Sequence, residues 1–387
     1  MNKKVDKPPF HSSGMTLFLT IAYPPNPTAS SLVHKNLLNQ FDPTSFIVLK
    51  GLFLGARKIS EPEFVTSKIV YISFEFISSK LHNLIAYFQK FTIPIFLKYF
   101  NWKYKPSILV IAYPDLFWVD ICSKFALKNN LPFVPYLHDT IIEGLYSSVQ
   151  KKNARNIQDR IFNNAKSIAV MSEGMRDLYK SKYAIETISW EHIYEEAPDL
   201  YVSPKFNRIH WSGDVYEINY KSVKRISEAI VSLNFIFTIS NGKSRELLNE
   251  LGLNAENFKK VFYPERKDYL KHLNDSKFVL LALNYPDECN VHEEELSTIF
   301  STKTPEYLGS NAIIIYNGPS NYFLAKFLKE YNCGVIIDSR DTAYIANKIK
   351  DLICNYEAYQ YLSLNAKSAL RKFNPQIVKQ KVIKTMN

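Results

Sequence analysis

Short apolar runs alternate with longer helical patterns along almost the whole chain, and this alternation constrains the fold more than any other feature. The runs are rich in β-branched and aromatic residues, as strands are. They occupy residues 16–22, 46–49, 68–74, 108–113, 133–137 and 167–171, and then 208–211, 235–239, 260–263, 278–283, 312–316 and 334–337. Nearly continuous apolar strands separated by helices are typical of parallel sheets covered on both faces, so the pattern predicts an α/β protein.

The alternation of strand and helix patterns is interrupted once, in the polar stretch 195–204. A chain of 387 residues is long enough for two domains at roughly 150 residues each. We predict a Rossmann-like domain over residues 1–200, a second over residues 201–370, and a C-terminal helix over 371–387, whose return to the first domain is left open. Ligands of open parallel sheets bind outside the carboxyl ends of the strands, which predicts a site in a central cleft that the two domains face.

Glycine and cysteine usage excludes several classes of protein. None of the 11 glycines stands at G-x-G spacing, and none ends a P-loop: Gly242 precedes Lys243, but Phe237 stands where the first glycine of that motif is required. Both observations disfavour dinucleotide-binding dehydrogenases and Walker-type NTPases. The four cysteines, Cys122, Cys289, Cys333 and Cys354, form no C-x-x-C pair and are expected to be buried thiols of a reducing compartment. Because neither a signal peptide nor a membrane-spanning stretch is apparent, we expect a cytoplasmic protein.

A proline-rich loop follows the first predicted strand and leads into an amphipathic helix. It contains Pro25, Asn26, Thr28 and Ser30. Unbonded N–H groups at the start of a helix suit an anionic or hydroxyl-rich ligand, so these residues are candidates for an acceptor-side loop. The plain alternative is a strand–helix turn capped by serine.

His138 and Asp139 directly follow the predicted strand 133–137, again at a carboxyl end. A histidine followed by a polar loop is poorly explained by core packing, so we interpret the two residues as candidate catalytic residues. The alternative is a structural histidine beside an aspartate that caps the next turn.

The segment from residue 300 to 316 is the most informative. Lys303 and Glu306, three positions apart at the start of a predicted helix, lie on one helix face. At a ligand site, such a pair supplies a cation for a phosphate and a carboxylate for a ribose diol. On the surface, it is an ion pair worth only tenths of a kcal/mol.

This segment, K-x-x-E-Y-L-x-x-x-A-I-I-I, resembles the donor-site signature of GT-B glycosyltransferases of family 4. Residues 18–41, 169–175 and 209–214 resemble other parts of the family in the same order, so the resemblance covers nearly the whole chain. It implies a donor nucleotide on the second domain, an acceptor on the first, and mostly retaining transfer without a metal. It also implies that Glu306 binds the ribose, that Gly318 and Ser320 lie near the diphosphate, and that Gly213 belongs to the donor site.

Two departures from the family pattern leave the phosphate-binding cation open. Thr298 stands where the family often has the first glutamate of a Glu-x7-Glu pair. Asp214 follows Gly213, where many members have an arginine, and the first lysine nearby is Lys221. The candidates for the cation are Lys303, Arg266, Lys267 and Lys243.

An acidic loop precedes the donor segment, with Asp287, Glu288 and the run 293–295. Carboxylates repel a diphosphate, so we expect a solvated loop, with contacts to sugar hydroxyls as the alternative.

Basic and aromatic residues are interleaved from residue 80 to 105 in a chain of net charge +11. Such a segment is able to lie on an anionic membrane surface, apolar face down. The alternative is a helix packed on the sheet with its lysines extended into solvent. No nucleic-acid-binding motif is present, so we expect no nucleic-acid partner.

These observations together favour a glycosyltransferase of the hexosyltransferase type. It would move a sugar from a nucleotide-sugar, used as substrate and not as cofactor, to a glycan or lipid-linked glycan in bacterial-type surface polysaccharide or glycoconjugate synthesis. Peripheral association with the inner face of the cell membrane stays open. Two alternatives remain: a nucleotide-sugar 2-epimerase of the same fold, and a non-catalytic, membrane-associated protein that binds a nucleotide or a glycan.

Overall fold

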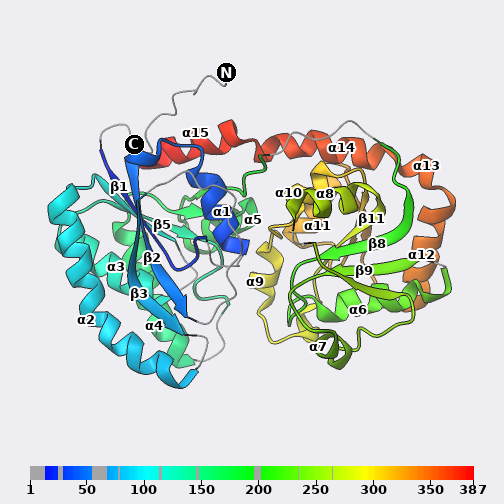
Figure 1. The fold of residues 1–387 in the computed structure, drawn as a ribbon, viewed down its shortest axis with the longest axis horizontal. Coiled ribbons are helices and arrows are strands. Elements are labelled where there is room, and N and C mark those ends of the chain that lie inside the picture. Colours follow the sequence, from blue (N-terminus) through cyan, green and yellow to red (C-terminus); the bar gives the residue numbers. More distant parts are fainter. Residues whose placement is uncertain are drawn as a thin grey trace. The chain divides into compact units, whose positions relative to one another are not determined.

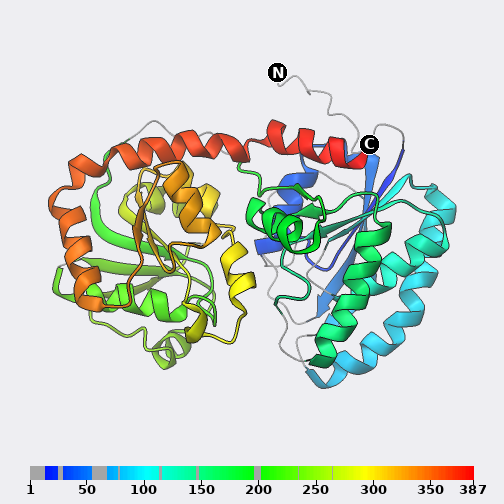
Figure 2. The same cartoon turned by 180° about the vertical axis from the view of Figure 1, so that it is seen from behind.

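The computed structural model describes residues 14–24, 29–54, 68–76, 79–112, 116–144, 148–195, 202–233, 235–263 and 265–387. The chain divides into two compact units. Unit 1 comprises Met1–Glu195 and Phe373–Asn387, and unit 2 comprises Glu196–Lys372. Each unit is built on one parallel sheet with helices on both faces (Figures 1 and 2).

Unit 1 has a seven-stranded sheet in the order β3-β2-β1-β4-β5-β6-β7, and all of its strand pairs are parallel. The strands are β1 (Thr16–Thr20), β2 (Phe46–Leu54), β3 (Lys68–Phe76), β4 (Ile108–Ala112), β5 (Phe133–Leu137), β6 (Ala169–Val170) and β7 (Ile188–Ser189). The helices are α1 (Ala29–Leu38), α2 (Ser79–Tyr104), α3 (Leu116–Lys128), α4 (Ser148–Asn164), α5 (Glu173–Tyr183) and α15 (Pro375–Met386), with a short 3-10 helix at Pro43–Ser45.

Alternate residues of the unit 1 strands enter two different cores, as the period of two in a strand requires. Leu17 and Leu19 join α2, α3, α4 and α5 in one core. Phe18 joins α1 and α15 in the other. The C-terminal helix α15 is therefore part of unit 1, where Trp190 Nε1 donates a hydrogen bond to Thr385 Oγ1 at 3.0 Å.

Unit 2 has a six-stranded parallel sheet in the order β10-β9-β8-β11-β12-β13. The strands are β8 (Phe206–Ser212), β9 (Ile236–Ser240), β10 (Phe258–Val261), β11 (Ser276–Ala282), β12 (Ile313–Asn317) and β13 (Val335–Ile337). The helices are α6 (Tyr220–Ala229), α7 (Arg245–Glu250), α8 (Arg266–Asn274), α9 (Glu293–Thr298), α10 (Thr304–Gly309), α11 (Phe323–Glu330), α12 (Thr342–Cys354), α13 (Tyr356–Tyr359) and α14 (Tyr361–Ala369). Short 3-10 helices occur at Val231–Leu233, Pro286–Glu288 and Leu370–Phe373.

Each sheet reverses its strand order once, between β1 and β4 in unit 1 and between β8 and β11 in unit 2. Ligands of doubly wound sheets bind at the carboxyl ends of the strands beside such a reversal. In unit 2, α6, α12 and the start of α14 share one core with the sheet, and α8, α10 and α11 lie on the other face of the sheet (Figure 1).

The predicted α/β fold class, with two Rossmann-like parallel-sheet domains, is confirmed, and each of the twelve predicted strands overlaps an observed one. The sequence pattern missed β7, which has only two residues. The prediction of four buried cysteines is wrong for two of them: Cys354, near the exposed end of α12, is exposed, and Cys289 is half-buried. Among the described helices, none is long and apolar enough to cross a membrane. That the two domains face a central cleft stays a prediction.

Candidate functional site

Glu306 lies at the start of α10, held among three side chains that leave it 3% exposed. Arg266 Nη1 donates a hydrogen bond to its Oε1 at 2.8 Å, and the Tyr269 hydroxyl donates to its Oε2, also at 2.8 Å. Lys303 Nζ lies 3.3 Å from Oε2. The structure therefore brings together three residues that the sequence singled out, Glu306, Lys303 and Arg266, and adds Tyr269.

The charge state of Glu306 follows from this cluster. Burial alone raises the pKa of a carboxyl, but the Lys303 and Arg266 charges, with the hydrogen bonds from Arg266 and Tyr269, outweigh it and lower the pKa from 4.5 to about 2. Glu306 is thus an anion at neutral pH. An ionised carboxylate accepts hydrogen bonds only, which suits a diol that donates two.

The N-terminal end of α10 lies against the carboxyl end of β8. Ser212, the last residue of that strand, donates its backbone N–H to the Tyr307 hydroxyl at 2.8 Å. Gly213 follows with φ +109°, a conformation that favours glycine. Its own N–H donates to Ser240 O at 2.9 Å and is therefore directed at β9.

Polar side chains tie together the loops after β11 and β12 and the start of α6. Asn284, just after β11, accepts the Ser222 N–H through Oδ1 at 3.0 Å. Asn317, the last residue of β12, accepts the Ser222 hydroxyl at 2.6 Å. Asn284 and Asn317 are both fully buried, so these amides fix the carboxyl edge of the sheet beside α6.

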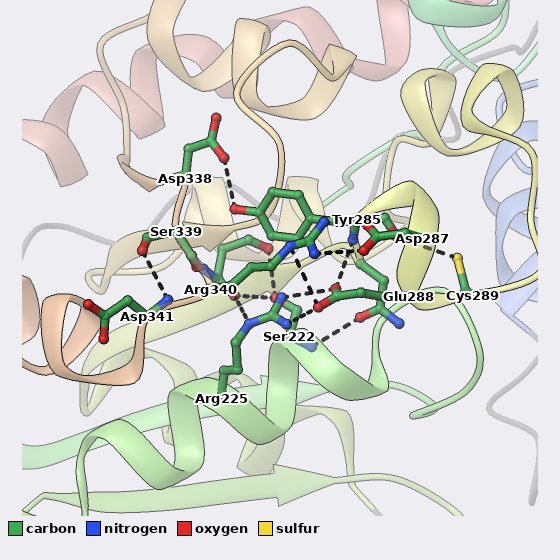
Figure 3. Close-up of polar contacts among 12 residues, drawn as sticks. Ser222, Arg225, Tyr285, Asp287, Glu288, Cys289, Asp338, Ser339, Arg340 and Asp341 are labelled. Atoms are coloured by element: carbon green, nitrogen blue, oxygen red, sulfur yellow. Dashed lines mark hydrogen bonds and ion pairs between the residues drawn. The ribbon is translucent and has the colours of Figure 1, made fainter.

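A charged cluster around Tyr285 continues this edge (Figure 3). The guanidinium carbons of Arg340 and Arg225 lie 4.2 and 5.4 Å from the centre of the Tyr285 ring. Arg225 forms an ion pair with Glu288 through both nitrogens, and Arg340 pairs with Asp287. The expectation of a solvated acidic loop is therefore wrong for Glu288, whose side chain is 9% exposed. It is also wrong for the run 293–295, which begins helix α9 and buries Glu295.

Gly318 and Ser320 occupy the loop after β12, next to this cluster. Gly318 has φ +150°, and a Cβ there would come within 2.6 Å of Leu283 O, so only glycine fits. The Ser320 N–H donates to Asp338 Oδ2 at 3.0 Å, and the Tyr285 hydroxyl donates to Asp338 Oδ1 at 2.8 Å. The Ser320 N–H therefore already binds a carboxylate at the position that the resemblance assigns to a diphosphate.

The four candidate cations differ in surroundings. Lys303 and Arg266 contact Glu306, as described above. Lys267, next in α8, is exposed, and Lys243 is half-buried in the loop after β9. Arg225 and Arg340, which the sequence did not single out, are engaged by carboxylates. In the part of the chain that the structure describes, no three His, Cys, Asp or Glu side chains are grouped as metal ligands would be.

His138 of unit 1 follows β5 and is half-buried beside a second histidine. Its Nε2 lies 2.9 Å from Nε2 of His34, which is fully buried in α1. The Tyr136 ring packs against it, with centroids 4.4 Å apart. Asp139 is exposed, although surrounding protein atoms raise the pKa of its carboxyl through partial desolvation. Ser30 lies in the first turn of α1, whereas the other loop candidates, Pro25, Asn26 and Thr28, fall outside the described residues.

Sequence reasoning missed Tyr269, Arg225, Arg340 and His34. A signal existed for one of them only: Tyr269 stands three residues after Arg266 and therefore on the same helix face. The others meet their partners through long-range packing that no local pattern encodes. His34 in particular occupies a buried position of an amphipathic helix, where an apolar residue is usual.

Comparisons with known proteins bear on the fold. No protein-family model matches this chain, and no curated protein matches it either. Among solved structures, the sucrose-phosphate synthase tll1590 of Thermosynechococcus elongatus matches with a TM-score of 0.66 at 10% identity, covering 95% of this chain and 96% of that one. Anabaena Alr3699/HepE in complex with UDP-glucose matches with a TM-score of 0.67 at 12% identity, covering 96% and 99%.

A third match is a glycosyltransferase from Rickettsia africae ESF-5, with a TM-score of 0.63 at 13% identity over 96% of this chain and 97% of that one. At such low identities the similarity bears on the fold alone. The chain has two Rossmann-like parallel-sheet domains and the GT-B fold of these glycosyltransferases.

Proposed function

We propose that this protein is a glycosyltransferase that moves a sugar from a nucleotide-sugar to a glycan or lipid-linked glycan. The observation that carries the proposal is the ionised, buried Glu306 at the carboxyl edge of the unit 2 sheet, in contact with two cations that are partly exposed. It supplies an acceptor for a ribose diol beside positive charge for a diphosphate. The fold supports the same function, since a structure of this fold, Alr3699/HepE, holds UDP-glucose.

The roles of the site residues follow from charge and position. Glu306 binds the ribose, and Lys303 with Arg266 stabilises the negative charge that develops on the leaving diphosphate. The transfer is proposed to be retaining and independent of a metal, with the leaving phosphate taking the proton of the acceptor hydroxyl. His138 lies beside the transferred sugar and the acceptor hydroxyl, Asp139 lies near it, and the loop from residue 24 to 31 borders the acceptor. The product belongs to bacterial-type surface polysaccharide or glycoconjugate synthesis.

Ligand binding gives the direct test. Thermal melting is measured with UDP, GDP, ADP, CMP and their common sugar conjugates, for the wild type and for Glu306→Ala. A ligand present at 100 times its Kd, bound only by the folded protein, stabilises by about 2.7 kcal/mol, which shifts the Tm by a few degrees. We expect a shift with one nucleotide in the wild type and none in Glu306→Ala. The control is Glu250→Ala, which removes an exposed carboxylate from α7.

Three outcomes separate this proposal from its alternatives. Transfer of label from the nucleotide-sugar to an acceptor supports the glycosyltransferase. Conversion of a UDP-sugar without any acceptor indicates the 2-epimerase. Binding without either reaction indicates a non-catalytic binding protein. Wild-type affinity in a folded Glu306→Ala variant would refute the assignment of Glu306.

We also propose that unit 1 binds an anionic membrane surface through α2. The inward face of this helix is buried at Gln89, Ile93, Leu97 and Phe100. A second apolar stripe is exposed, with 58% of Phe88, 60% of Phe91, 68% of Ile95, 46% of Tyr99 and 74% of Trp102 accessible to solvent. At roughly 100° per residue, these five residues lie within an arc of roughly 80° opposite the buried face.

The charges on α2 favour a membrane over a protein as the occupant of this stripe. The helix contains no Asp or Glu, and Lys90, Lys98 and Lys103 are exposed on it. Lys98 and Lys103 flank the stripe on its two sides at helical spacing. Aromatic side chains at the level of the headgroups, with lysines directed at anionic lipids, are typical of interfacial helices. Such a location would bring a lipid-linked acceptor to unit 1.

Vesicle binding tests this placement. The variant Phe91→Ser/Ile95→Ser/Trp102→Ser removes about 1–2 kcal/mol of apolar burial per residue, so its affinity for phosphatidylglycerol-containing vesicles is expected to fall about a hundredfold or more. The control changes three exposed apolar residues of unit 2, Phe262, Tyr361 and Leu364, to Ser. Equal binding by both variants, or an α2-dependent dimer in sedimentation with no vesicle binding, would contradict the proposal.

A further inference from the structure

Two histidines of unit 1, His34 and His138, form a chain of hydrogen bonds that begins at a backbone carbonyl. His34 Nδ1 lies 2.7 Å from Ala22 O, just after β1. His34 Nε2 lies 2.9 Å from His138 Nε2, just after β5. Because β1 and β5 both end at the carboxyl edge of the same sheet, this series of hydrogen bonds runs from the buried His34 to the half-buried His138 at that edge.

The chemistry of a carbonyl fixes the direction of every bond in this chain. A carbonyl oxygen only accepts, so His34 Nδ1 must carry the proton that it shares with Ala22 O. The Thr20 hydroxyl, which donates to the same carbonyl at 3.0 Å, lies 3.1 Å from His34 Nδ1 and does not change this assignment. A neutral imidazole has one donor and one acceptor, so His34 Nε2 is an acceptor and His138 Nε2–H donates to it.

Both rings are neutral near pH 7. Burial lowers the pKa of His34 from 6.5 to about 4, and the hydrogen bond to Ala22 opposes this only in part. Burial also lowers the pKa of His138 well below 6.5, and the neighbouring His34 and His192 charges add to the effect. The remaining ring neighbour of His138 is Tyr136, whose hydroxyl donates to Trp190 O at 2.8 Å.

We infer that His34 is a positioning residue that holds His138 in its Nε2–H form and leaves the Nδ1 lone pair to accept a hydrogen bond from a substrate hydroxyl. Among the residues that the structure describes, the hydrogen-bond partner of the His138 ring is His34, and it meets Nε2, not Nδ1. The group that this atom takes is therefore a donor, an alcohol of the sugar or of the acceptor, and never a phosphate oxygen. This inference rests on the proposed glycosyltransferase function for the identity of the hydroxyl, but the hydrogen-bond chain itself does not.

Two polar substitutions of His34, similar in size, distinguish its hydrogen bond to His138 from its hydrogen bond to Ala22 O. In His34→Gln, the side-chain oxygen reaches the position of Nε2 and still accepts from His138. In His34→Asn, the shorter amide keeps a donor for Ala22 O but does not reach His138. A purely structural role of His34 would be affected similarly by both, whereas positioning of His138 survives only in His34→Gln.

Ring-labelled histidine gives a readout that does not depend on turnover. The protein has 8 histidines, and His138→Gln identifies the His138 signals in the full-length protein. We expect a protected Nε2–H cross-peak of His138 in the wild type and in His34→Gln, and its loss by exchange with water in His34→Asn. An Nδ1–H signal of His138 in the wild type, or an unchanged Nε2–H signal in His34→Asn, would overturn the inference.

Kinetics extend the test to the substrate. In His34→Asn, kcat is expected to fall roughly ten- to hundredfold, with the KM for the donor within about twofold and kcat recovered in His34→Gln. An unchanged kcat in a folded His34→Asn would overturn the substrate-binding part of the inference. Absence of turnover in the wild type, with the expected cross-peaks present, would instead count against the proposed function.

Discussion

Acidification is expected to remove the electrostatic stabilisation around Glu306, and its size follows from the pKa. The side chain is 4% exposed, and its pKa falls from 4.5 to about 2 in the folded protein. A carboxyl whose pKa is lowered by folding stabilises the protein above the unfolded pKa and loses that contribution as the pH falls toward the folded pKa. The contribution is about 3 kcal/mol at pH 6 and about 1.4 kcal/mol at pH 3.

Urea unfolding of the wild type and Glu306→Gln at pH 6, 5, 4 and 3 measures this contribution. Trp211, the one tryptophan in the sequence of unit 2, reports the relevant transition by fluorescence. The gap in unfolding free energy between the two proteins should narrow by about 2 kcal/mol over this range. The control is Asp287→Asn, which removes an exposed ion pair with Arg340 that solvent screens. The difference in unfolding free energy between this variant and the wild type should therefore be small. A gap for Glu306→Gln that does not change with pH would refute the reasoning.

Two further predictions concern the carboxyl edge of the unit 2 sheet. Gly318→Ala places a Cβ within 2.6 Å of Leu283 O at φ +150°. Measured by urea titration, the free energy of unfolding should fall by about 2 kcal/mol. A loss below about 0.5 kcal/mol would contradict the close approach. Arg225→Met leaves the buried Glu288 without its main ion partner and should cost about 3 kcal/mol, whereas Arg340→Met, at a side chain 46% exposed, should cost less than about 1 kcal/mol. Equal losses of thermal stability in the two arginine variants would contradict the difference in burial.

The strand–helix order and every strand except the two-residue β7 were predictable, because these strands coincide with short runs rich in apolar residues. The meeting of Lys303 with Glu306 was predictable for the same reason, since three positions on a helix define a shared face. β12 is buried at every position and β11 at every position except Lys277, which explains why their apolar runs are continuous and not alternating.

Contacts between distant segments were not predictable. Arg266 and Glu306 are 40 positions apart, and Arg225 and Glu288 are 63 apart. A run of acidic residues has the same appearance whether its carboxylates face water or guanidinium groups, which is why Glu288 was expected to be solvated. His34 lies 104 positions from His138, and its helix pattern marks it as a core position without showing what it contacts there.

The ion pair between Arg266 and Glu306 should affect binding of the two parts of the donor, the ribose and the diphosphate, in opposite directions. Glu306 Oε1 already accepts from Arg266, and Oε2 accepts from Tyr269, with Lys303 at 3.3 Å. A ribose diol that donates two hydrogen bonds must therefore compete with Arg266, whereas a diphosphate gains from its charge. In Arg266→Gln, we expect the affinity for UDP to fall about tenfold while that for uridine stays equal or rises, as titration calorimetry would measure. If the thermal-melting test identifies a nucleotide with another base, its nucleoside diphosphate and nucleoside replace UDP and uridine in this comparison. Equal losses for the two ligands would mean that Arg266 orients Glu306 and does not bind the diphosphate.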